Sequence, residues 1–445
     1  MRAILVLLAL VVVAWGVFVF RPTGEVEGGE SAAEAPPGPF LTRPERSPAT
    51  EESPLPAPRP AAADRDEPVP EARDQQPAPE PPAEDRAAFG ISLDVPSGDI
   101  DDRVLAEALL FEGPGGVEQA LGRINESDDA TRRLYLSFSE ALAGNRRAGL
   151  KLAQGLDDPD VLGAADREML QAALSGQAGP AARPASFREE SSVRAAMRLR
   201  LLEREANRLL DSADYAGAAA GFSELLLSAV KGPWEPTRAA LLAWTDGVNR
   251  SQAQHRWSPR GDWPGVDVTV RDGDNLTLIR KRYLADHPNG MICTGLIARA
   301  NGVEGYLHEN QQLRIPTDRA SALVDLSSRW VFYLLGGEVA AAWEAGIGRD
   351  GEETILGDFV AADKQERPTW FKRGQEPRYF PDNPLGTRWI AWYRDGAKTG
   401  FGFHGTWEEE SIGKAASDGC VRLRNDDVEV LFAILPAGAA IHTQM

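Results

Sequence analysis

The spacing of apolar residues changes several times along the chain. Residues 3–20 form a run of 18 residues without a charged side chain. Between residues 100 and 255, apolar residues recur at every third or fourth position, which predicts amphipathic helices. From residue 320 onward, short apolar runs end at glycine or serine pairs, which is typical of β-strands joined by hairpin turns. The pattern predicts a multidomain chain in which an all-α region precedes a mostly-β domain.

The first apolar run is long enough to cross a lipid bilayer. As a helix it would measure about 27 Å, close to the ~30 Å hydrocarbon core. We therefore expect residues 1–21 to form a transmembrane anchor. A cleaved signal peptide is the alternative, although Ala14-Trp15-Gly16 is a poor cleavage site because bulky residues continue the run after it. Both interpretations predict a protein of the cell envelope, anchored in the inner (cytoplasmic) membrane in the first case, with folded domains in the periplasm or wall space.

Residues 22–90 are predicted to be a disordered linker. They contain 16 of the 32 prolines, and 15 acidic residues against 6 basic ones. Such a segment cannot bury enough apolar surface to offset the entropy of ordering the chain. As a flexible coil it would span on the order of 45–50 Å. The whole chain has a net charge of −19, which argues against a nucleic-acid partner.

Residues 91–258 are predicted to form the all-α region. Residues 206–219 resemble the joint between the two helices of a tetratricopeptide repeat (TPR), where small Ala and Gly residues let helices approach closely. One copy is recognisable, so an ordinary helical bundle is the alternative to this TPR-like arrangement. We expect the region to act either as a docking surface for a protein partner or as a spacer.

Residues 265–317 are predicted to fold as strand, helix, helix, strand (βααβ). The motif VRDGDNL at 270–276, Asn301, and the closing segment Gln312–Pro316 resemble a LysM domain. The resemblance implies binding to glycans that contain N-acetylglucosamine. A structural remnant without glycan affinity is the alternative.

The last segment carries a histidine and a cysteine in neighbouring motifs. His404-Gly405-Thr406 ends a predicted strand, and Cys420 lies sixteen residues after the histidine. A cysteine is a useful nucleophile only as thiolate, so a nearby imidazole that accepts its proton is required. A glycine before the cysteine would leave the amides of Gly419 and Cys420 free to bind an oxyanion. The pair alone leaves a structural role open, because isolated Cys and His residues are often structural.

With two cysteines and five histidines, the chain lacks the residues for a disulfide framework or a Cys-rich zinc site, and we expect no metal and no cofactor. Cys293 is interpreted as a small buried apolar residue. We expect Cys293 and Cys420 to stay unpaired, because they lie in modules that are expected to fold separately.

Residues 321–445 resemble the L,D-transpeptidase (YkuD-type) catalytic family in several motifs at once. The matching stretches are residues 354–359, 383–389, 404–406, 411–414 and 417–425. Two positions depart from the family pattern. Ile355 replaces the usual proline, and Asp418 stands where many members have a second histidine. A carboxylate beside Cys420 disfavours the thiolate.

This resemblance implies a peptidoglycan L,D-transpeptidase. Cys420 would attack the carbonyl of the third residue of a tetrapeptide stem and release D-Ala, with His404 as the base. An amine of a second stem would then resolve the acyl-enzyme. The candidates for substrate or oxyanion binding are Gly405, Ser417, Gly419, Arg422 and Asn425.

Several alternatives remain at this point. Arg422 is expected either to hold a substrate carboxylate or to form a salt bridge with Asp426 or Asp427. Water could replace the amine acceptor, which would make the protein an L,D-carboxypeptidase. A non-catalytic scaffold that binds peptidoglycan is the third possibility.

Overall fold

The computed structural model describes residues 100–123, 129–176, 191–231, 236–259, 261–371 and 375–445. All of them belong to one compact unit. The predicted anchor at 1–21 and the predicted linker at 22–90 lie outside the described residues. Among the helices that the structure describes, none combines the length and the apolar composition that a membrane crossing needs.

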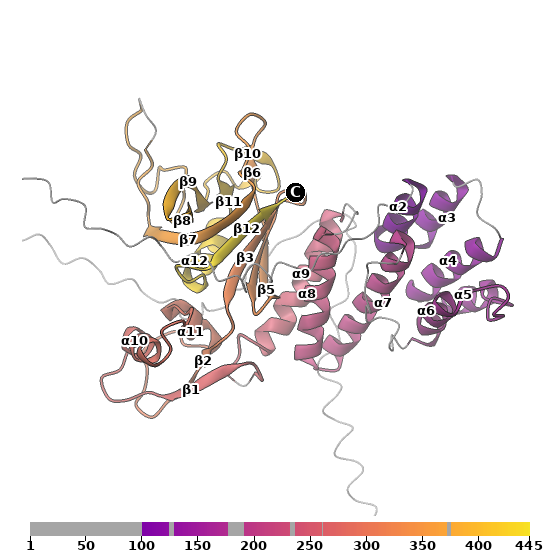
Figure 1. Cartoon of the computed structure of the whole chain (residues 1–445), viewed down its shortest axis with the longest axis horizontal. Helices are drawn as coiled ribbons and strands as arrows, with labels where there is room; N and C mark the ends of the chain where they lie inside the picture. Colours follow the sequence, from indigo (N-terminus) through magenta and orange to yellow (C-terminus); the bar gives the residue numbers. More distant parts are fainter. Residues whose placement is uncertain (1–99, 124–128, 177–190, 232–235, 260, 372–374) are drawn as a thin grey trace, which may run out of the picture. The chain divides into compact units, whose positions relative to one another are not determined.

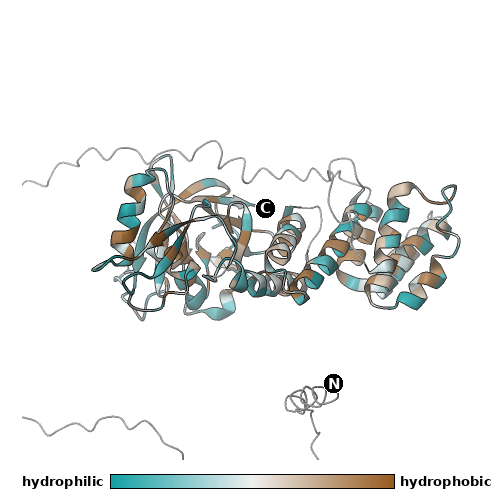
Figure 2. Ribbon diagram, turned by 90° about the horizontal axis from the view of Figure 1, so that it is seen from below, coloured by the Kyte–Doolittle hydropathy of each residue, from teal (hydrophilic) through white to brown (hydrophobic). Residues whose placement is uncertain are grey.

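A helical region precedes the sheet, as the apolar spacing predicts. Brown and teal residues alternate along its helices in Figure 2, which reflects one apolar and one polar side. Its α-helices are labelled in Figure 1. In chain order, the elements are α2 (Ile100–Glu107), the π-helix η1 (Ala108–Glu112), α3 (Gly113–Arg123), α4 (Asp129–Leu142), α5 (Arg146–Leu152), α6 (Ala164–Ser175), α7 (Ser192–Asp211), α8 (Tyr215–Lys231) and α9 (Arg238–Gln254).

The joint between α7 and α8 has the close approach that its small residues predict. A Cβ atom on Gly221 would lie 2.9 Å from the Cβ atom of Ala206, so a larger residue at 221 would push the helices apart. Ser191 and Thr237 cap α7 and α9 by accepting hydrogen bonds from backbone amides of the first turn.

Residues 265–317 form a strand, two helices and a strand in the predicted order. These are β1 (Gly265–Thr269), α10 (Leu276–Asp286), α11 (Thr294–Ala300) and β2 (Gln312–Pro316), and β1 pairs antiparallel with β2. The Asn301 side chain links α11 to β2, because it donates to the carbonyl of Arg314 and accepts from its amide, both at 2.7 Å. The LysM assignment of this segment stays a prediction.

The C-terminal segment is a mostly-β domain with a curled eight-stranded sheet, which confirms the predicted fold class for this part. The strand order is β11-β9-β8-β7-β12-β3-β4-β5. The helix α12 (Asn425–Ile434) packs beside it, and β6 (Ile347–Gly348) pairs with β10 (Ala415–Ser417) in a separate two-stranded sheet. The sheet strands are β3 (Ala320–Asp325), β4 (Trp330–Leu335), β5 (Glu338–Glu344), β7 (Gly357–Glu366), β8 (Arg388–Arg394), β9 (Ala397–His404), β11 (Val421–Arg422) and β12 (Ala440–Gln444).

Both faces of the central strands are buried, which explains their continuous apolar sequence. On β4, Trp330, Phe332 and Leu334 pack into the hydrophobic cluster of the helical region. The alternate residues Val331 and Tyr333 pack into a second cluster that also contains α10, α11 and α12. Because successive strand residues point to opposite faces, β4 links two cores. The segments that were expected to fold separately therefore share hydrophobic cores.

The outer strand β5 is covered by helices α8 and α9 (Figure 1). Ser223 of α8 accepts a hydrogen bond of 2.8 Å from the amide of Val339, and Gln252 of α9 donates to the carbonyl of the same residue at 3.0 Å. Trp257 donates to the carbonyl of Ala340 at 3.2 Å. Side chains of the helical region thus satisfy backbone groups that an edge strand would otherwise expose.

Replacing Ser223 with Ala should destabilise the protein, because the buried amide of Val339 would lose its acceptor. We expect the free energy of unfolding to fall by about 1–3 kcal/mol. Urea unfolding followed by circular dichroism measures this change. Ser212→Ala, which removes an exposed hydroxyl in the same region, is the matched control and should change the free energy by less than about 0.5 kcal/mol. Equal effects of the two substitutions would show that the hydrogen bond between Ser223 and β5 contributes nothing to the free energy of unfolding.

Candidate active site

The turn that carries Cys420 is held on both sides by one short segment. The amide of Ile347 donates to the carbonyl of Lys414, and the amide of Arg349 donates to that of Ser417 at 3.0 Å. Past the cysteine, Gly346 and Arg422 exchange two backbone hydrogen bonds of 2.9 and 2.8 Å. Residues 346–349 therefore span the base of the turn and hold its two ends in register.

Inside the turn, Ser417 bonds to the residues that follow it. Its hydroxyl donates to the carbonyl of Cys420 at 2.6 Å and accepts from the amide of Gly419 at 3.1 Å. Gly419 has φ of +103°, and a Cβ there would lie 2.5 Å from the ring of Phe401, so glycine is required.

The expectation that the Gly419 amide is free for an oxyanion is therefore wrong. The Ser417 hydroxyl, a candidate for substrate binding, is also occupied within the turn. The amide of Cys420 is the other predicted donor, and no acceptor among the described residues bonds to it.

His404 ends β9 and is almost fully buried, with 4% of its surface exposed. Its Nδ1 lies 2.5 Å from the carbonyl oxygen of Gly405. A carbonyl can only accept, so Nδ1 carries the proton and Nε2 is the basic nitrogen. The imidazole also stacks on Trp389 of β8, with ring centroids 5.9 Å apart. Gly405, a predicted candidate for substrate or oxyanion binding, thus orients the imidazole through its carbonyl.

Strand pairing brings Cys420 toward the histidine. β11 runs parallel to β9, with Val421 opposite Phe403 and Arg422 opposite His404. One step back along both strands, Cys420 lies beside Gly402, and its sulfur is 4.0 Å from the carbonyl oxygen of Gly400. Gly402 and His404 are two residues apart on one strand and so point to the same face.

Asn425, at the start of α12, organises the loops around the histidine. Its side-chain oxygen accepts from the amide of Thr387 at 3.1 Å, and its nitrogen donates to the carbonyl of Thr406 at 2.9 Å. A Cβ on Gly386 or Gly405 would lie 2.2 or 2.1 Å from the Asn425 oxygen. The two glycines are therefore needed for Asn425 to bridge both loops, and its side chain is used in the scaffold.

Arg422 pairs with a partner that the motifs did not indicate. Its Nη1 lies 2.8 Å from a carboxylate oxygen of Glu408, and its side chain is 15% exposed. The alternative of a salt bridge with Asp426 or Asp427 is wrong. Asp427 instead has Arg424 within 3.9 Å. Glu408 lies in the loop between the histidine motif and the cysteine motif. The sequence of this loop contains no signal that predicts the contact with Arg422.

Desolvation favours the neutral forms of the buried His404 imidazole and of the half-buried Cys420 thiol at pH 7. Desolvation raises the pKa of the Cys420 thiol to about 11, although the Gly402 backbone and the Arg422 cation lower it, and the Asp418 carboxylate adds to the increase. Desolvation also lowers the pKa of His404 to about 4, against the opposing effect of its hydrogen bond to Gly405. The resting site therefore contains a thiol and a neutral imidazole.

The second cysteine, Cys293, was predicted to be a small buried apolar residue, and the structure shows it half-buried and away from this site. The Cys293 thiol donates to the carbonyl of Ala433 in α12 at 3.1 Å, which keeps it at the junction with the sheet domain. Both cysteines are free, as predicted. Across the described part of the chain, no group of three or more His, Cys, Asp or Glu side chains could hold a metal ion.

Because both groups are neutral, we expect Cys420 to react slowly with iodoacetamide in the resting protein. At pH 7 its alkylation should be at least tenfold slower than that of free cysteine, and the rate should rise steadily beyond pH 9. Mass spectrometry of the Cys293→Ser variant measures the alkylation rate, because Cys420 is then the one thiol in the chain. Alkylation that is fast at pH 7 and does not accelerate at higher pH would indicate a preformed thiolate and contradict the neutral state of Cys420 and His404.

Comparison with known proteins gives these residues a family context. Residues 319–442 match the family model of the YkuD L,D-transpeptidase catalytic domain. The chain is 38% identical over 109 residues to the putative L,D-transpeptidase YqjB of Bacillus subtilis, which covers 24% of this chain and 61% of that protein. It is 28% identical over 201 residues to the probable L,D-transpeptidase ErfK/SrfK of Salmonella typhimurium, covering 40% of this chain and 63% of that protein.

The chain thus spans somewhat less than two thirds of the length of these two relatives. Among solved structures, an L,D-transpeptidase from Mycobacterium smegmatis aligns with 19% identity and a TM-score of 0.25, over 31% of this chain and 64% of that one. The family match and the sequence relatives support a YkuD L,D-transpeptidase catalytic domain at residues 319–442.

Proposed function

We propose that the protein is a peptidoglycan L,D-transpeptidase in which Cys420 is the nucleophile and His404 the base. The observation that carries the proposal is the histidine tautomer. Nδ1 donates to the Gly405 carbonyl, which leaves Nε2 basic on the strand beside the cysteine. The family match at residues 319–442 supplies the reaction class.

The neutral resting pair determines the order of events in this mechanism. The sulfur bonds to the carbonyl carbon of the third stem residue while its proton moves to Nε2 of His404. The carbon–nitrogen bond to terminal D-Ala then breaks, and the imidazolium returns the proton to the leaving amine. This leaves a thioester on Cys420 and free D-Ala.

The second half of the reaction runs through the same groups. A side-chain amine of another stem attacks the thioester, loses a proton to His404, and forms an amide as the thiol is regenerated. The amide of Cys420 is the candidate oxyanion donor, since that of Gly419 is bonded to Ser417. Arg422 remains the candidate for a substrate carboxylate, and a bound carboxylate would compete there with Glu408.

Replacing Cys420 with Ala should abolish release of D-Ala and formation of the thioester. The measurement is incubation of the 91–445 fragment, which contains all described residues, with a disaccharide-tetrapeptide, and analysis of the products by mass. The Cys293→Ser variant is the matched control and should keep full turnover.

Crosslinked dimers among the products identify an amine acceptor. Tripeptide alone would identify water as acceptor and an L,D-carboxypeptidase instead. Undiminished turnover by the Cys420→Ala variant would contradict the cysteine mechanism.

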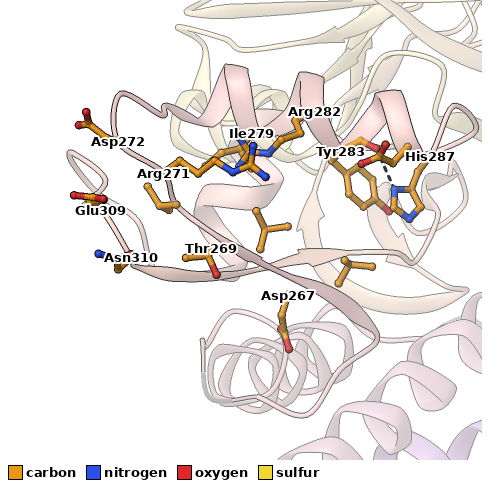
Figure 3. A pocket seen from close by; sticks show the side chains of 14 residues that line it. Asp267, Thr269, Arg271, Asp272, Ile279, Arg282, Tyr283, His287, Glu309 and Asn310 are labelled. Carbon is orange, nitrogen blue, oxygen red and sulfur yellow. Dashed lines mark hydrogen bonds between the residues drawn. The ribbon is translucent and has the colours of Figure 1, made fainter.

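We also propose that residues 265–317 bind the glycan strand. A groove of about 580 Å³ lies between β1 and α10 and continues to the loop before β2. Figure 3 shows the side chains that line it. Arg271 and Arg282 lie in its middle, and Tyr283 stacks on His287 at one end with ring centroids 4.3 Å apart. The loop that supplies Glu309 and Asn310 to the groove also carries Tyr306, which is 96% exposed. Polar groups beside aromatic rings are suited to sugar hydroxyls and sugar faces.

Replacing Tyr306 with Ala should weaken binding to intact sacculi severalfold and leave turnover of a small soluble muropeptide unchanged. A side chain that is 96% exposed contributes little to folding, so the effect would report on glycan contact. Sacculus pull-down and product analysis measure the two quantities. Leu150→Ala, at an exposed position of the helical region, is the control. If sacculus binding is unchanged, Tyr306 does not contact the glycan.

The remaining roles are also proposals. We propose that residues 1–21 anchor the protein in the cytoplasmic membrane, with the folded part in the periplasm or wall space. The helical region would then be available to a protein partner, in addition to covering β5.

A further inference from the structure

An ion pair lies at the turn that carries the proposed nucleophile. Nη1 of Arg349 is 2.5 Å from Oδ1 of Asp418, and about half of each side chain is exposed. Asp418 is two residues before Cys420, at the position where the chain departs from the family pattern. The structure thus pairs the unusual carboxylate with a cation from a different segment.

The backbone of Arg349 is fixed to the same turn. Its amide donates to the carbonyl of Ser417 at 3.0 Å, and it directly follows β6, which pairs with β10. On the other side, its carbonyl accepts from the amide of Glu352 at 2.9 Å. The Arg349 side chain therefore extends from a segment whose position relative to Cys420 is set by main-chain hydrogen bonds.

The charge of Asp418 matters because the cysteine beside it must become an anion. Burial already raises the pKa of the thiol, and the nearby carboxylate raises it further, whereas the Arg422 cation lowers it. The elements packed around the turn also carry other titratable or charged groups: His404 and Lys398 on β9, Glu408, Glu409, Glu410 and Lys414 in the segment before β10, and Asp350, Glu352 and Glu353 in the loop after Arg349.

We propose that Arg349 is a positioning residue for the nucleophile: it holds the Asp418 carboxylate in an ion pair and so shields the Cys420 sulfur from that negative charge. The role in turnover rests on the proposed transpeptidase function. The effect on the thiol does not, because it concerns the ease with which sulfur loses its proton in the free protein.

The test is a set of substitutions in the full chain that carries Cys293→Ser, so that Cys420 is the one thiol. Arg349→Gln should slow alkylation of Cys420 by iodoacetamide at pH 8–9 by about two- to fivefold, the size expected from a partly exposed charge. Asp418→Asn should accelerate it by a similar factor. In the Asp418→Asn background, Arg349→Gln should have no effect, because the charge that it shields is gone.

A matched control comes from another ion pair of the same domain. Lys398 contacts Asp363 at 2.7 Å, with comparable exposure. Lys398→Gln should leave alkylation of Cys420 unchanged. An equal slowing by this variant would overturn the proposal, since it would show a general effect of net charge.

Two other results would also overturn the proposal. The first is an alkylation profile that Arg349→Gln does not change. The second is equal slowing by Arg349→Gln with and without Asp418→Asn, which would show that Arg349 acts by holding the loop. The release of D-Ala by these variants should follow the alkylation rates. If the unmodified chain releases no D-Ala but its alkylation rates respond as expected, the proposed function fails while the role of Arg349 stands.

Discussion

The bridge made by the Asn425 side chain is the contact on which the geometry of the candidate site depends. It joins the start of α12 to two loops that flank His404, through the amide of Thr387 and the carbonyl of Thr406. The bridge leaves no space for a side chain at Gly386 or Gly405. Because the Gly405 carbonyl fixes the histidine tautomer, the same bridge also determines which ring nitrogen can act as base.

Desolvation outweighs the local charges in setting the protonation of the site. It is the largest cause of the raised pKa of Cys420 and of the lowered pKa of His404. A neutral pair, with His404 buried and Cys420 half-buried, avoids the cost of an unpaired desolvated charge. In the proposed mechanism, charge develops as substrate arrives, so the small contributions of Arg422 and Asp418 to the pKa of Cys420 add to the larger effect of desolvation. This is why a half-exposed ion pair at the turn can matter for reactivity while contributing little to stability.

The sequence predicted most of the β domain, because its strands are short apolar runs bounded by recognisable turns. The serine and glycine pairs, Ser327-Ser328 and Gly336-Gly337, lie at the turns between β3, β4 and β5. The histidine and cysteine motifs were also recognisable, since each is local. The pairing of Arg422 with Glu408, and of Arg349 with Asp418, was not. Such contacts depend on which loops the fold brings together, and one sequence contains no signal for that.

The boundary between residues 265–317 and the β domain could not be predicted correctly from sequence alone, because it also depends on contacts between distant segments. Helix α12 carries Asn425 at its first turn, whereas its other end contacts residues 265–317. There, a Cβ on Gly295 would lie 2.2 Å from the carbonyl oxygen of Ala433, and the Cys293 thiol donates to that oxygen. Lys364 of β7 also donates to the carbonyls of Phe432 and Leu435. The glycan-binding candidate and the catalytic candidate thus contact opposite ends of one helix, and removal of residues 265–317 would expose apolar surface of the helix that carries Asn425. Substitution of single exposed residues can separate their functions, whereas deletion cannot.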